Sequence, residues 1–193
     1  RKDDGRTLRN LTMRQPLLLS LGIFAAGLTF APHAADASTP SLTVLGTAPT
    51  TWKVDPAHTT VGFRIKHMEA SWFYGRFNEV SGTVIYDPEQ PAASSISFEV
   101  NAASVDTHNQ DRDDHLRNAD FFNAKVHSKI SFTSKKIEPL GENRMSVTGM
   151  LALHGVEKEI KIEAQFIGTG KAPWGELAGF ETEFTIKRGD YGI

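Results

Sequence analysis

Apolar and polar residues alternate with a period of two along most of the chain after Thr51. Successive side chains of a β-strand point to opposite faces, so a period of two gives each strand one wet and one dry face. This pattern predicts an all-β domain. Four segments show it most clearly, and their apolar positions are Val61, Phe63 and Ile65; Ile96, Phe98 and Val100; Ile160, Ile162, Ala164 and Phe166; and Ala178, Phe180, Phe184 and Ile186.

Turn-forming clusters such as Asp87-Pro88 and His154-Gly155 separate the alternating segments. Long amphipathic strands joined by short turns favour an antiparallel barrel, because closing the sheet removes its exposed edges. A two-sheet sandwich is the alternative. We expect eight strands, over about residues 51–55, 59–68, 76–87, 94–106, 128–138, 143–153, 157–169 and 177–188.

One segment, Asn109–Phe122, lacks the alternation and predicts a short helix between the fourth and fifth long strands. Asn109 or Asp111 would cap it, and Leu116 would lie on its apolar side. Its polar residues are Asp111, Arg112, Asp113, Asp114, His115 and Arg117.

Three roles fit this polar cluster: capping and seating the helix over one barrel end, contacting a lipid headgroup, or binding a metal. Hard cations take carboxylates and zinc takes histidine. The spacing matches neither an EF-hand loop nor an H-E-x-x-H helix. The structural role is therefore favoured, and no metal site is expected.

The N-terminal part has the pattern of a secretory signal peptide. Met13-Arg14 precedes an apolar run over Leu17–Phe30, and Ala35-Asp36-Ala37 follows as a small-x-small cleavage site. The run is too short to span a bilayer, which takes about 20 residues. We expect cleavage after Ala37 and a periplasmic product without a stable membrane span, with a membrane anchor as the alternative.

The chain then divides into three parts. Residues 1–37 hold the upstream residues and the signal peptide, residues 38–50 form a leader rich in Ser, Thr, Pro and Ala, and residues 51–193 form the barrel domain.

Composition excludes several function classes. The net charge of −2 gives no basic surface for nucleic acid. Cysteine is absent, which excludes disulfides, thiolate metal sites and a cysteine nucleophile. The sequence contains no G-x-S-x-G or G-x-G-x-x-G motif, so we expect neither an enzyme nor a cofactor.

From Thr51 onward the chain contains a series of motifs whose order and spacing cover the whole predicted domain. They are W-K-V-D-P-A-H-T at 52–59, G-R-F at 75–77, D-R-D-D-H-L-R-N-A-D-F-F at 111–122, I-S-F-T-S at 130–134, L-H-G-V at 153–156 and K-R-G-D-Y-G at 187–192. On these motifs the chain resembles the YceI-like family of bacterial periplasmic polyisoprenoid-binding proteins. The resemblance implies a lipocalin-like, eight-stranded antiparallel barrel with an apolar tunnel. It also implies that the tunnel holds a long isoprenoid lipid or a polyprenyl quinone.

Family members usually continue past the last of these motifs into one more loop and strand, whereas this sequence stops at Ile193. The resemblance therefore predicts a C-terminal fragment whose closing strand is missing, with an exposed edge and an opened tunnel.

The interior of an eight-stranded barrel fits either packed side chains or one slim ligand. The residues alone leave both open, and the resemblance favours the tunnel. Histidines at strand ends or turns would donate to a ligand oxygen or to a buried carbonyl. The expected ligand-binding residues are Phe63, Ile65, Phe77, Ile85, Ile96, Phe98, Phe132, Leu151, Phe180, Phe184, His58, His67 and His154.

Binding or carriage of an isoprenoid lipid in the periplasm, without chemistry, is the function that these observations favour. A stress-related interaction protein with a packed barrel and a lipid-modifying enzyme are the alternatives, and a homodimer is left open.

Overall fold

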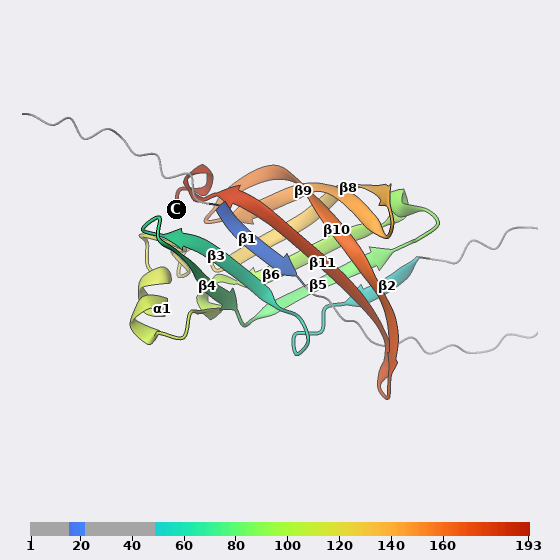
Figure 1. Cartoon of the computed structure of the whole chain (residues 1–193), viewed down its shortest axis with the longest axis horizontal. Helices are drawn as coiled ribbons and strands as arrows, with labels where there is room; N and C mark the ends of the chain where they lie inside the picture. Colours follow the sequence, from blue (N-terminus) through green and yellow to red (C-terminus); the bar gives the residue numbers. More distant parts are fainter. Residues whose placement is uncertain (1–15, 22–48) are drawn as a thin grey trace, which may run out of the picture.

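The computed structural model describes residues 16–21 and 49–193 (Figure 1). These residues hold one antiparallel sheet of eleven strands in the order β2-β5-β6-β8-β9-β10-β11-β1-β3-β4-β7. The strands are β1 (Pro16–Leu21), β2 (Thr50–Lys53), β3 (Val61–His67), β4 (Ser71–Phe77), β5 (Val80–Tyr86), β6 (Ser95–Asn101), β7 (Val105–Asp106), β8 (Lys129–Gly141), β9 (Arg144–Leu153), β10 (Val156–Ala172) and β11 (Gly175–Lys187). The helical elements are α1 (Gln110–Leu116) and the 3-10 turns η1 (Pro91–Ala93), η2 (Ala102–Ser104) and η3 (Arg188–Tyr191).

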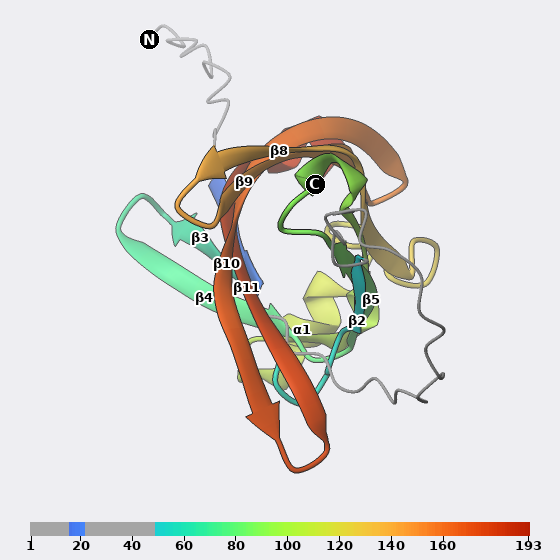
Figure 2. The same cartoon turned by 90° about the vertical axis from the view of Figure 1, so that its right-hand side faces the viewer.

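The sheet closes because two long segments, β4–β5 and β6–β7, bend and pair with each other on both sides of the bend. Strand β4 pairs with β3 and continues into β5, which pairs with β6. At this corner the Asn78 amide donates to the Ser104 carbonyl and the Asn101 amide donates to the Glu79 carbonyl, each at 3.0 Å. Backbone pairing thus passes from β4–β7 to β5–β6 without a break. Figure 2 shows the resulting ring of strands, and the predicted antiparallel barrel with one short helix is confirmed.

The predicted strand boundaries need correction. The segment predicted as 76–87 begins at Ser71, because the chain reverses at Met68 and Glu69, which have φ of +48° and +58°. It is divided into β4 and β5 by the corner, and the predicted segment 94–106 is divided into β6 and β7 by η2. When each bent pair is counted once, the ring has eight strands, β3, β4–β5, β6–β7, β8, β9, β10, β11 and β1, and β2 is added beside β5.

Strand β1 lies within the predicted signal peptide and completes the ring. It pairs antiparallel with β11, with Leu19 opposite Phe184, and with β3, with Leu19 opposite Phe63. It therefore fills the gap between β11 and β3, where a barrel that lacked its closing strand would be open. The predicted cleavage site after Ala37 and nearly all of the predicted leader fall outside the described residues.

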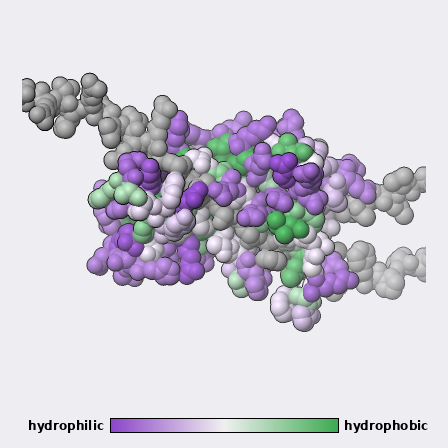
Figure 3. Space-filling model, viewed as in Figure 1, coloured by the Kyte–Doolittle hydropathy of each residue, from purple (hydrophilic) through white to green (hydrophobic). Residues whose placement is uncertain are grey.

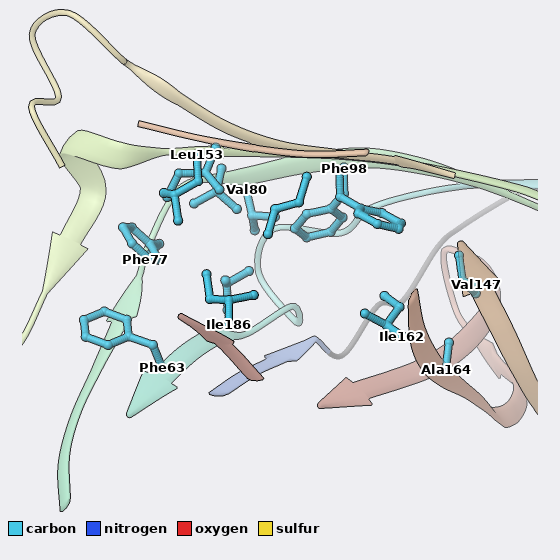
Figure 4. Close-up of a cluster of buried hydrophobic side chains, with 14 of the residues drawn as sticks. Phe63, Phe77, Val80, Phe98, Val147, Leu153, Ile162, Ala164 and Ile186 are labelled. Carbon is cyan, nitrogen blue, oxygen red and sulfur yellow. The ribbon is translucent and has the colours of Figure 1, made fainter. Parts of the chain in front are cut away.

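The inward faces of the strands form one apolar core (Figure 4). Val61 and Val147 are completely buried, and on β9 the buried positions alternate from Val147 to Leu153. Fully burying a side chain of this kind stabilises the fold by about 1.5–3 kcal/mol, so the closed ring holds itself together chiefly by its interior. Polar residues cover most of the outer surface in the space-filling view (Figure 3).

Helix α1 covers one end of the barrel and is shorter than the predicted segment 109–122. The Asn109 side chain caps it by accepting from the Arg112 amide at 2.9 Å. After Leu116 the chain turns, and Phe122 packs edge-on against Phe77 with ring centroids 5.3 Å apart. The second half of the predicted helix is thus a turn that places an aromatic ring in the core.

The charged cluster of α1 holds the helix against β7 and its neighbours. Asp113 is buried and accepts from the amide and the hydroxyl of Thr107. Arg112 donates to the Thr107 carbonyl at 2.7 Å and to its hydroxyl at 2.8 Å. Arg117 donates to the carbonyls of Ala103 at 2.8 Å and Val105 at 3.1 Å.

The remaining members of this cluster make weaker or more exposed contacts. His115 Nε2 lies 3.3 Å from the Asp120 carboxylate. Asp111 lies in the first turn, where the positive end of the helix dipole stabilises a carboxylate. These contacts hold the helix and the turn after it together.

Asp113→Ala is expected to lower the free energy of unfolding by about 2–4 kcal/mol, because it leaves the buried Thr107 amide and hydroxyl without an acceptor. Chemical denaturation of the purified protein measures this. Asp114→Ala is the matched control: Asp114 is 61% exposed and pairs with Arg117 at the surface, so its loss should cost at most about 1 kcal/mol. Equal effects of the two substitutions would contradict the assignment.

The carboxylate of Asp106 should make the fold sensitive to acid. Hydrogen bonds from the His108 amide, the Asn78 amide group and the Arg76 guanidinium hold its pKa below the usual value of 3.8. A lowered folded-state pKa adds stability that is present above the unfolded pKa and is lost as pH falls through the folded pKa. Asp106→Asn should therefore flatten the fall in unfolding free energy below about pH 4. Denaturation at a series of pH values tests this, and an unchanged slope would refute it.

Candidate functional site

The barrel encloses an apolar cavity between strands β5, β6, β8, β9, β10 and β11. Its volume is about 60 Å³, several times the volume that one buried water requires. The residues that line it are Val84, Ile96, Phe98, Val100, Ile130, Ser131, Phe132, Leu151, Ile162, Ala164, Phe180, Glu181, Thr182 and Phe184.

Six of the residues expected to contact a ligand line this cavity, although their contact with a ligand stays a prediction. They are Ile96, Phe98, Phe132, Leu151, Phe180 and Phe184. The prediction omitted Val100, Ile162 and Ala164, which share inward faces with the named residues in the alternating pattern. That pattern was sufficient to find them.

Three other predicted residues lie inside the barrel but away from this cavity. The ring centroids of Phe63 and Phe77 lie 5.5 Å apart with the rings tilted, and both rings contact that of Phe122 near α1. Ile65 is half-buried against the same core. This end of the barrel is therefore filled by its own aromatic side chains.

Ile85 was predicted to face inward, and that prediction is wrong. Val84 lines the cavity and Tyr86 packs in the core, so the intervening Ile85 points to the other face of β5. Three consecutive apolar residues hide the strand's register, because alternation cannot be read from such a run.

The three predicted histidines do not line the cavity. His58 is 57% exposed, and its Nδ1 lies 2.8 Å from Asp55, whose pKa is lowered chiefly by this hydrogen bond. His67 is exposed at the end of β3. His154 adopts a left-handed turn conformation with φ of +53°, and its Nδ1 donates to the Tyr191 carbonyl at 3.0 Å. Turns at strand ends direct these imidazoles away from the cavity.

Three aromatic rings cluster at one end of the cavity. Tyr86 lies 5.0 Å from Phe166 and 5.5 Å from Phe180 between ring centroids, and the two phenylalanines are 5.3 Å apart. Phe180 also lines the cavity. Burial, together with the nearby charge of Asp87, raises the pKa of Tyr86, so its phenol is neutral at ordinary pH. This aromatic triad therefore offers an uncharged wall at the cavity's end.

The walls of the cavity suit hydrocarbon rather than polar groups. The hydroxyl of Thr182 is already used, since it donates to the Glu163 carbonyl at 2.6 Å. Within residues 16–21 and 49–193, no three His, Asp or Glu side chains converge on a point where a metal could bind. In the same part of the chain, no helix is both long and apolar enough to cross a membrane.

Comparison with known proteins gives consistent results. Residues 52–193 match the pattern of the YceI-like domain. A UPF0312 protein of Pectobacterium atrosepticum is 43% identical over 137 residues, which cover 70% of this chain and 71% of that protein. Protein YceI of Escherichia coli is 42% identical over 145 residues, covering 74% of this chain and 75% of that protein.

Solved structures show the same architecture. The crystal structure of a Campylobacter jejuni YceI protein is similar, with a TM-score of 0.59 and 38% identity, over 72% of this chain and 82% of that one. Burkholderia cenocepacia BcnA is similar in fold, with a TM-score of 0.58 and 21% identity, over 69% of this chain and 99% of that one.

Gly149 permits the close packing of the cavity wall. A Cβ atom at this position would lie 2.5 Å from the Phe132 ring and 2.5 Å from the Thr133 carbonyl oxygen. Gly149→Ala should therefore displace Phe132 and lower the unfolding free energy by about 1–3 kcal/mol. Gly170→Ala is the control, because nothing lies within 4 Å of its added carbon. Thermal denaturation compares the two, and a neutral Gly149→Ala would contradict this packing.

Proposed function

Because the chain belongs to the YceI-like family, we propose that its barrel binds and carries a long-chain polyisoprenoid lipid, such as a polyprenyl quinone-like amphiphile, without changing it chemically. The observation that carries the proposal is the cavity, since six strands line it with predominantly apolar side chains. An apolar cavity with few convergent polar groups is the usual form of a small-molecule site.

The energetics favour recognition of the tail over the headgroup. Burying one methylene contributes about 0.8 kcal/mol, nearly as much as one polar contact, which contributes about 1 kcal/mol. A tail of several isoprene units carries many such carbons. Much of this gain is lost when a flexible tail is immobilised, so affinity does not follow from area alone. We expect sensitivity to tail length and tolerance of headgroup changes.

The cavity must widen to admit a long tail. Its space of about 60 Å³ holds only a few carbon groups, whereas the proposed ligand has many. Phe98, Phe132, Phe180 and Phe184 dominate the walls, and rotation of these rings would join the cavity to the adjoining apolar interior. Binding would thus exchange contacts between rings for contacts between rings and tail.

The proposed place of action is the periplasm. Its support is the N-terminal pattern of a basic start, an apolar run and the Ala35-Asp36-Ala37 site. Cleavage after Ala37 would remove β1, whereas all six strands that line the cavity lie after this site.

Organic extraction of the full chain, purified without detergent from its native host, should release an isoprenoid amphiphile that mass spectrometry identifies. Ala164→Leu should lower the amount of lipid per protein about tenfold, because the added carbons occupy the void and overpacking costs about 1–3 kcal/mol.

Ala152→Leu provides the matched control. Ala152 directly follows the cavity-lining Leu151 on β9, so it points to the opposite face of the strand, and it pairs with the exposed Glu157. The lipid content of Ala152→Leu should equal that of the unmodified protein. Repeated recovery of empty protein would overturn the proposal and favour a packed barrel. Normal lipid content in a folded Ala164→Leu protein would place the ligand elsewhere.

A further inference from the structure

Lys158 is a charged residue on the inner face of the barrel. It pairs on β10 with Leu151 of β9, and directly opposed residues of an antiparallel pair point to the same face of the sheet. Leu151 lines the cavity, so the Lys158 side chain leaves the strand on the cavity side. Lys158 also shares its strand face with Ile162 and Ala164, which line the cavity as well. A cation therefore lies at the rim of the apolar wall.

Arg188 adds a second cation to the same end of the barrel. It follows Ile186 by two positions, and the residue between them has extended backbone, so Arg188 leaves the chain on the inner side, as the core residue Ile186 does (Figure 4). The last pair of β10 with β11 joins Ala164 to Thr182. Lys158 lies six residues from that pair on β10, and Arg188 lies six residues from it in the other direction along the chain. The two cations are therefore at the same level of neighbouring strands.

Tyr191 lies between the two cations. It belongs to the 3-10 turn η3 together with Arg188, and residues three positions apart in such a turn lie on the same side. The Lys158 ammonium lies 5.8 Å from the centroid of the Tyr191 ring. The hydrogen bond from His154 Nδ1 to the Tyr191 carbonyl, at 3.0 Å, holds η3 against the turn between β9 and β10. We call Lys158, Arg188 and Tyr191 the basic cluster.

The donors of the basic cluster lack acceptors within the described part of the chain. Tyr191 is only 2% exposed, and its buried hydroxyl makes no hydrogen bond there. Burial, and then the charge of Asp190, raise the pKa of this phenol, so it stays protonated and can donate. The buried Nε of Arg188 also has no acceptor, and neither Lys158 nor Arg188 forms an ion pair among the described residues. Buried donors without acceptors are costly, so the cluster suits a ligand that accepts hydrogen bonds.

The charge of the basic cluster favours an anion. Glu157 and Glu159 adjoin Lys158 in the sequence, but both are exposed on the outer face of β10. Asp190 is the carboxylate of η3 itself; it is exposed, and together with Lys158 and Arg188 it leaves a charge of +1. Ammonium and guanidinium groups are the usual partners of phosphate and carboxylate oxygens in proteins.

We propose that Lys158, Arg188 and Tyr191 bind an oxyanion, a phosphate or a carboxylate, at the rim of the cavity. Lys158 and Arg188 are half-buried, so an anion reaches them from the solvent. When a lipid occupies the cavity, the oxyanion is its headgroup; this assignment rests on the proposed function, whereas the site itself does not require it. The tail then supplies most of the affinity, and the basic cluster adds a preference for acidic over neutral headgroups.

Two probes with the same tail separate the headgroup from the cavity. Farnesyl phosphate and farnesol, titrated calorimetrically onto the full chain, differ only in the phosphate. The unmodified protein should bind farnesyl phosphate about tenfold more tightly than farnesol, because the phosphate gains charge-assisted hydrogen bonds. Lys158→Met keeps the length of the side chain and removes its charge. It should lower the affinity for farnesyl phosphate about tenfold and leave that for farnesol unchanged.

Lys161→Met is the matched control, because Lys161 is an exposed lysine on the outer face of the same strand. At physiological salt it should change neither affinity by more than about twofold, since exposed charges are screened. Equal losses in Lys158→Met and Lys161→Met would overturn the proposal, because net charge and not position would then decide. Equal affinity of the unmodified protein for the two probes would overturn the oxyanion site and leave the proposed function intact.

Inorganic phosphate distinguishes a free anion from a headgroup. If it binds the unmodified protein but not Lys158→Met, and farnesyl phosphate binds no more tightly than inorganic phosphate, the site stands for a free anion and the proposed function fails. If none of the three probes binds, both fail.

Chemical denaturation checks that Lys158 serves a ligand and not the fold. Lys158→Met should unfold at the same denaturant concentration as the unmodified protein, because the ammonium has no hydrogen bond or ion pair to lose within the described residues. A clear fall in that concentration, with the preference for farnesyl phosphate retained, would assign Lys158 to the fold and overturn the site.

Discussion

Closure of the sheet is the constraint on which the rest of this structure depends. Bending of β4–β5 and β6–β7 lets one sheet return to its own edge, and the apolar sides of the strands from β3 to β11 then face a shared interior. Such an interior has no water to satisfy polar groups, so the side chains that point into it must be apolar or already hydrogen-bonded. Thr182 meets this condition through the Glu163 carbonyl.

The two ends of the interior are organised differently. Near α1, the rings of Phe63, Phe77 and Phe122 fill the space, and hydrogen bonds from Arg112 and Arg117 hold the helix over them. Toward the other end, Phe180 joins the cavity to Tyr86 and Phe166. The filled end supplies stability, and the end with the cavity supplies the proposed binding.

The period-two pattern was enough to predict the antiparallel barrel and much of the cavity wall, because a strand with one buried face alternates apolar and polar residues. The prediction failed where this alternation is absent. The run Val84-Ile85-Tyr86 conceals which side faces in, and the corner at Asn78 interrupts a strand without a Gly or Pro signal. The positions of histidines at turns depend on backbone conformation, such as the left-handed turn at His154, which the sequence does not encode by periodicity.

The ladders around the ring differ greatly in length, and this has a consequence for motion. Strands β8 and β9 pair from Ser131 to Gly141, whereas β4 and β7 share only two pairs, at Arg76 and Phe77. Segments with few cross-strand bonds open locally at a lower free energy than long ladders. Amide protons of β4 and β7 should therefore exchange with solvent long before those of β8 and β9. The barrel is thus rigid along β8 and β9 and opens more easily between β4 and β7.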